Sequence, residues 1–88
     1  MSIFKKKCWP EYFKDVYSGK KNYDLRLNDF ELNEGDTLIL EEWDPKTQEY
    51  SGRVAERKVT YVGKWKIQDL FWSEKEIMDK GIQIISLE

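Results

Sequence analysis

Apolar residues between positions 9 and 17 follow the spacing of one face of a helix. They recur every three or four positions, at Trp9, Tyr12, Phe13, Val16 and Tyr17. Pro10 suits the first helical position, where its missing N–H costs nothing, and Gly19 suits the left-handed residue that ends many helices. We therefore predict an extended segment over about residues 3–9 and a helix over about 10–18, with its aromatic stripe mostly in the core.

Strict alternation replaces helical spacing after residue 21. Tyr23, Leu25 and Leu27 fall on one side of an extended chain, and the polar residues on the other are Asn22, Asp24, Arg26 and Asn28. This alternation is typical of a half-buried strand with one polar face.

A hairpin is predicted in the middle of the chain. Residues 37–43 have strand character, with Leu38 and Leu40 facing inward, and Asp-Pro-Lys-Thr at 44–47 favours a turn. A partner strand over about residues 52–62 should pair with the first one, because the connection is short and rich in turn residues.

The C-terminal part predicts one helix and one strand. Ser73 and Glu76 have the spacing of a capping box, and Gly81 follows the last helical residue, which predicts a helix over about residues 74–80. Residues 82–87 are apolar enough to supply a last strand.

These elements predict the α+β class, in one domain over residues 1–88. In a chain of 88 residues, about five strands and two short helices are best satisfied by a small β-barrel, because closure hides the sheet edges. An open α+β sheet is the alternative that periodicity leaves.

Composition indicates a folded domain inside the cell. Hydrophobic residues make up 40% of the chain and charged residues 36%, which is unlike a disordered segment. We expect a cytoplasmic protein without a membrane contact, because no apolar run approaches the length of a bilayer span and the start has no apolar signal region. The single cysteine, Cys8, fits a reducing compartment and a buried position.

The net charge of −2 is unevenly distributed. Residues 1–26 carry seven Lys or Arg and three Asp or Glu, residues 27–51 carry one and eight, and residues 52–88 carry seven and six. A basic footprint over the whole chain is absent, which argues against long duplex DNA as a partner. A nucleic-acid site would have to be a local basic patch of single-strand or nucleotide size.

The ordered motifs over residues 4–62 resemble one known family. They are Pro10-Glu11-Tyr12-Phe13, Val16, Gly19-Lys20-Lys21, Asp24-Leu25-Arg26, Asn28-Asp29, Gly35-Asp36 and Tyr50-Ser51-Gly52-Arg53. This pattern resembles the bacterial and phage domain of unknown function 3850, within the ASCH branch of PUA-like domains. The resemblance implies a PUA-like barrel that binds RNA in a cleft. This chain departs from the family's His-x-Leu-Lys start, because Phe4, Lys6 and Lys7 stand there, and residues 63–80 have little to match.

The resemblance also implies where the ligand lies. The candidate ligand-binding residues are Lys7, Lys20, Lys21, Asp24, Arg26 and Asn28. Arg and Lys side chains beside a concave surface can hold phosphate groups. From the residues alone another interpretation is open, in which the lysines complement the helix C-terminus and Arg26 pairs with a carboxylate such as Asp24. Among the aromatic residues, Trp65 and Trp72 are the best candidates for exposed platforms on which unpaired bases could stack.

Two other functions stay open. Some small ASCH relatives are amidohydrolases of acetylated cytidine that use a lysine, a threonine and a glutamate; Lys21 matches that lysine, whereas Asp24 stands at the threonine position. A carboxylate there would keep Lys21 protonated, so we expect binding rather than catalysis. The third possibility is a protein-interaction domain. We expect no metal and no cofactor, because the chain has no histidine and one cysteine.

Overall fold

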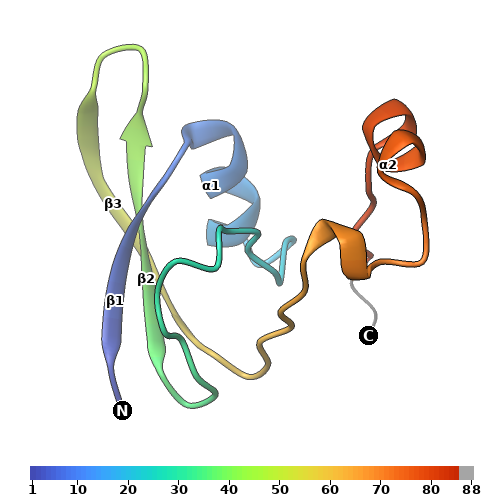
Figure 1. The fold of residues 1–88 in the computed structure, drawn as a ribbon. Coiled ribbons are helices and arrows are strands. Elements are labelled where there is room, and N and C mark those ends of the chain that lie inside the picture. Colours follow the sequence, from blue (N-terminus) through green and yellow to red (C-terminus); the bar gives the residue numbers. More distant parts are fainter. Residues whose placement is uncertain (86–88) are drawn as a thin grey trace.

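A computed structural model describes residues 1–85, whose core is an open sheet of three strands with a helix on one face (Figure 1). β1 (Ile3–Cys8) and β2 (Thr37–Asp44) are parallel, and β3 (Glu49–Lys58) pairs with β2 in the antiparallel sense, which gives the order β1-β2-β3. No helix in residues 1–85 has the length and apolar character that a membrane crossing needs.

Helix α1 (Pro10–Tyr17) begins and ends where the sequence predicts. Gly19 follows it at φ +86°, in the left-handed region that favours glycine. The prediction that its aromatic stripe lies mostly in the core is wrong, because only Phe13 and Val16 are buried whereas Tyr12 and Tyr17 are half exposed. A single helix on a narrow sheet has room to bury about one residue per turn, so the flanking rings stay at the surface.

The hairpin of β2 and β3 is confirmed, with different limits. Its turn is fixed by Asp44, whose carbonyl accepts from the Gln48 N–H at 2.7 Å and whose Oδ1 accepts from the Lys46 N–H at 2.8 Å. The partner strand starts at Glu49 and ends at Lys58 rather than running over 52–62. It ends there because Lys58 pairs with Thr37, the first residue of β2.

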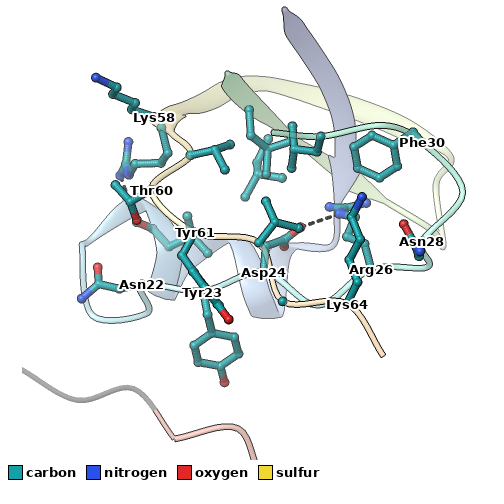
Figure 2. A pocket seen from close by; sticks show the side chains of 18 of the residues that line it. Asn22, Tyr23, Asp24, Arg26, Asn28, Phe30, Lys58, Thr60, Tyr61 and Lys64 are labelled. Carbon is teal, nitrogen blue, oxygen red and sulfur yellow. Dashed lines mark hydrogen bonds and ion pairs between the residues drawn. The ribbon is translucent and has the colours of Figure 1, made fainter. Parts of the chain in front are cut away.

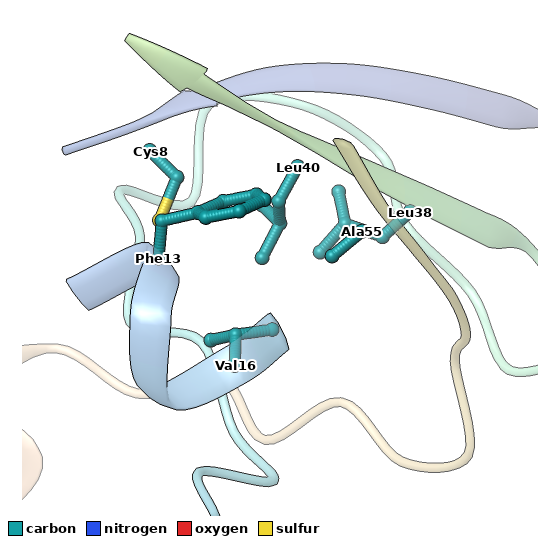
Figure 3. Packing of buried hydrophobic residues seen from close by; sticks show 6 residues of the cluster. All are labelled: Cys8, Phe13, Val16, Leu38, Leu40 and Ala55. Atoms are coloured by element: carbon teal, nitrogen blue, oxygen red, sulfur yellow. The ribbon is translucent and has the colours of Figure 1, made fainter. Parts of the chain in front are cut away.

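The core lies between α1 and the sheet (Figure 3). Its members are the buried residues Cys8, Phe13, Val16, Leu38, Leu40 and Ala55. Leu38 and Leu40 face inward as predicted, because alternate residues of a strand share one face. Phe13 is completely buried and fills the centre of the cluster.

The predicted five-stranded barrel is wrong, since the described sheet has three strands and does not close. Residues 21–36 contain neither helix nor strand, although their alternation predicted a strand. The expected sides are also reversed, because Asp24 and Arg26 are half-buried while Leu25 and Leu27 are exposed. Residues 82–85 form no strand, and the rest of the predicted last strand lies outside the described residues.

An arginine side chain donates a hydrogen bond to a backbone carbonyl on the outer side of β1. The Ser2 carbonyl accepts from the Thr37 N–H at 2.9 Å, so even-numbered residues of β1 bond toward β2 and odd-numbered ones point away. The Lys7 carbonyl therefore points outward, where Arg26 Nη2 donates to it at 2.6 Å.

The outer side of β3 has a similar feature. The Val59 N–H donates to the Asp36 carbonyl at 2.8 Å, which leaves the backbone groups of the even-numbered residues at this end of β3, before its register shift, pointing away from β2. One of these outward groups, the Glu56 carbonyl, accepts from Arg57 Nη1 at 2.8 Å. In each of the two outer strands, therefore, one backbone carbonyl that points away from β2 accepts a hydrogen bond from an arginine.

The second predicted helix is confirmed as α2 (Glu74–Lys80), preceded by the short 3-10 helix η1 (Ile67–Asp69). Ser73 and Glu76 form the predicted capping box, in which each side chain bonds the other residue's backbone N–H. α2 has no buried residue and lies away from the sheet in Figure 1. Local capping rather than core packing defines this helix.

Candidate functional site

A cavity of about 420 Å³ opens beside the core, on the face of the sheet that α1 covers. Its apolar floor consists of Val16, Leu38, Leu40 and Val59. Its walls are residues 21–32, which form no regular structure, and residues 57–64, where the chain leaves β3 (Figure 2). The volume lies at the small end of the range for ligand pockets.

Asp24 and Arg26 form an ion pair in one wall of this cavity. Arg26 Nε donates to Asp24 Oδ2 at 2.5 Å, and the two side chains are 17% exposed for Asp24 and 27% for Arg26. Because Arg26 Nη2 also donates to the Lys7 carbonyl, the guanidinium is held at two points. The pairing that was the alternative interpretation from residues alone is therefore present, and it lies inside the cavity (Figure 2).

Lys21 lines the same cavity and lies between two aromatic rings. Its Nζ is 5.1 Å from the ring centroid of Tyr12 and 4.9 Å from that of Tyr23. Both distances are within the reach of cation–π attraction. The two rings thus hold the Lys21 side chain at the cavity.

Two of the six predicted residues are not in the cavity. Lys21, Asp24, Arg26 and Asn28 line it, whereas Lys7 and Lys20 do not. Lys7 alternates with the buried Cys8 along β1 and so projects from the other face of the sheet, where its Nζ is 4.1 Å from the Trp43 ring centroid. Only its backbone carbonyl contributes, by holding Arg26.

The sequence did not reveal the second wall. Arg57, Lys58, Thr60, Tyr61 and Lys64 line the cavity from the segment after the sheet. The sequence predicted that β3 continues to residue 62, so these residues were assigned to a paired strand rather than to the wall of a cavity. Three basic residues within this stretch were the signal that could have found it.

Two basic residues of the second wall make contacts with other parts of the chain. Arg57 Nη2 donates to the Val16 carbonyl at 3.0 Å and so satisfies the C-terminus of α1. Lys64 Nζ lies 3.7 Å from Glu31 Oε1 in an exposed pair that bridges the two walls. Such a pair is weak in water, so Lys64 can turn to another anion.

Cys8 is buried near the wall that holds Asp24 and Arg26. Burial is the main cause that raises the pKa of the Cys8 thiol, and the negative charge of Asp24 raises this pKa further. The thiol therefore stays protonated at neutral pH and is a poor nucleophile. Among residues 1–85, no group of three or more His, Cys, Asp and Glu side chains is placed to hold a metal ion.

Comparison with known families identifies a family that covers most of the chain. The family described as Domain of unknown function (DUF3850) matches residues 3–72. The chain belongs to the DUF3850 family. All cavity-lining residues of this DUF3850 domain lie within the matched span, and α2 lies outside it. No curated protein and no solved structure matches the chain.

Proposed function

We propose that this DUF3850 domain binds RNA or a nucleotide in the cavity, without turning it over. The observation that supports this proposal is an apolar floor beneath basic side chains. The floor can accept the flat face of a base, and Lys21 and Lys64 on the walls can meet phosphate oxygens. The resemblance to ASCH domains points to the same class of ligand.

The size and charge of the molecule limit the ligand further. A cavity of about 420 Å³ suits one nucleotide, either free or at the end of a short single strand. Eight acidic residues within 27–51 give the middle of the chain a negative charge, which disfavours a long duplex. The proposed ligand is therefore small or single-stranded.

Neighbouring lysines provide a matched test. Short single-stranded RNA and mononucleotides would be titrated against wild type, Lys21→Ala and Lys20→Ala, because Lys21 lines the cavity and Lys20 does not. We expect weak binding that Lys21→Ala lowers severalfold and Lys20→Ala leaves unchanged, and that declines as salt rises. Equal losses of affinity in Lys21→Ala and Lys20→Ala would show that the ligand does not bind in the cavity. No binding of any nucleotide or RNA by wild type would overturn the proposal.

A further inference from the structure

The carboxylate of Asp24 can accept hydrogen bonds beyond the one it receives. Arg26 Nε donates to Oδ2, whereas an ionised carboxylate has about four lone-pair positions on its two oxygens. Oδ1 and the second position of Oδ2 therefore have acceptor capacity toward a ligand. Since Asp24 lines the cavity and is only 17% exposed, a ligand in the cavity can reach this capacity with little competition from water.

The position of this carboxylate is fixed before a ligand arrives. Arg26 is bonded to Asp24 on one side and to the Lys7 carbonyl of β1, at 2.6 Å, on the other. The chain thus anchors Asp24 to the edge of the sheet although residues 21–36 form no regular structure. A pre-positioned acceptor costs little ordering on binding and so discriminates well between ligands.

The natural bases differ in what they offer a carboxylate. Guanine has two neighbouring donors on its Watson–Crick edge, the N1–H and the N2 amino group, which match two carboxylate oxygens. Adenine and cytosine offer an amino group beside an acceptor nitrogen, and the N3–H of uracil lies between two carbonyl oxygens that a carboxylate repels. Two parallel hydrogen bonds therefore form with guanine alone.

We infer that the cavity selects guanine nucleotides, with the N1–H and N2 amino group of the base donating to Asp24. This inference rests on the proposed function and deepens it. The base lies over Leu38, Leu40 and Val59 of the floor, and the phosphate lies toward Lys21 or Lys64.

Four mononucleotides test the inference on the wild-type protein. GMP, IMP, AMP and UMP share ribose and phosphate, and IMP differs from GMP only by the missing N2 amino group. We expect calorimetric titration to give an affinity for GMP about tenfold or more above that for UMP, with IMP between them. Because this comparison uses wild type alone, it does not depend on the folding of any variant.

One substitution locates the selectivity. Asp24→Asn keeps the size of the side chain and an oxygen for Arg26, but it replaces one acceptor by a donor. We expect GMP to lose its advantage over UMP in Asp24→Asn and to keep it in Glu34→Gln, an exposed carboxylate outside the cavity lining. Circular dichroism would check that both variants are folded.

The outcomes separate the inference from the proposed function. Similar affinities for all four nucleotides in wild type, or an unchanged GMP preference in folded Asp24→Asn, would overturn guanine selection while nucleotide binding stands. No binding of any nucleotide or RNA would overturn both.

Discussion

Arg53 donates two parallel hydrogen bonds to Glu42, from Nε to Oε1 and from Nη2 to Oε2, each 3.0 Å long. Glu42 is buried, with 6% of its surface exposed, and the guanidinium carbon lies 5.4 Å from the ring centroids of both Phe13 and Tyr17. A bidentate pair stacked on aromatic rings joins β2, β3 and α1 at one point.

This pair predicts a loss of stability in acid. Hydrogen bonds from Arg53 are the main cause that lowers the pKa of Glu42, and a bond from Ser51 adds to them against the effect of burial. Because the folded pKa lies below the unfolded one, the stabilisation is present above the ordinary glutamate pKa of about 4.3 and is lost as pH falls through the folded pKa. We expect the thermal midpoint to fall in that window.

Glu42→Gln tests the assignment of this acid dependence. The variant should have a lower thermal midpoint than wild type at pH 7 and a smaller further decrease in acid. Some decrease of the thermal midpoint in acid should remain in Glu42→Gln because of Asp36. Hydrogen bonds from the Ser2 and Asn33 N–H groups lower the pKa of Asp36 too. An acid profile of Glu42→Gln parallel to that of wild type would show that Glu42 does not titrate as described.

Gly19 predicts a cost for any β-branched residue at the end of α1. A Cβ at this position meets no atom within 4 Å, so the cost of Gly19→Val comes from φ +86° alone. We expect a loss of about 1 kcal/mol or more in the free energy of unfolding, measured with denaturant. Gly19→Asn should lose less, because asparagine tolerates the left-handed region. Equal losses of unfolding free energy in Gly19→Val and Gly19→Asn would show that the cost does not come from the left-handed backbone conformation.

The core predicts a large difference between two residues of the same helical stripe. Phe13 is completely buried and Tyr12 is half exposed. Phe13→Ala should lower the free energy of unfolding by about 3–5 kcal/mol, and Tyr12→Ala should lower it by less than about 1 kcal/mol. If Tyr12→Ala proved as costly in a denaturant titration, the exposed position of that ring would be wrong.

Binding without turnover predicts no release of acetate from acetylated cytidine by the wild-type protein. The carboxylate of Asp24 is engaged by Arg26, and Lys21 Nζ lies against two rings that attract a cation. Asp24→Thr introduces the residue type of the hydrolytic ASCH domains that the sequence resembles, so a gain of activity in this variant alone would support the cavity assignment. Turnover by wild type that Lys21→Ala abolishes would refute the binding-only function.

Local signals explain which elements could be predicted. The limits of α1 and α2 follow from Pro10, Gly19 and the capping box at Ser73, all of which act within one helical turn. A strand needs a partner elsewhere in the chain, and alternation does not report whether one exists. Arg26 donates to Asp24 and to the Lys7 carbonyl of β1, and these two bonds draw both side chains inward while Leu25 stays exposed.

The same limit applies to the cavity. Lys21, Asp24, Arg26 and Asn28 were predicted from the resemblance and do meet there. The second wall was not predicted: its three basic residues signal a charged segment, but the position of that segment depends on β3 ending opposite the start of β2. Lys7 was misplaced because the face from which it projects depends on the register of β1 against β2.

Guanidinium groups donate to the Lys7 and Glu56 carbonyls at the two outer edges of the sheet, and we expect them to limit association at high protein concentration. A bare outer strand can template the addition of a second chain and so start a polymer. Arg26 and Arg57 each cover one acceptor that an incoming strand would need. Arg26 therefore both positions Asp24 in the cavity and covers the edge of β1. Its loss should cause partial association in solution together with any change in ligand affinity. A binding measurement on Arg26→Ala has to be made on the monomeric fraction, because polymers would hide or imitate the loss of a ligand.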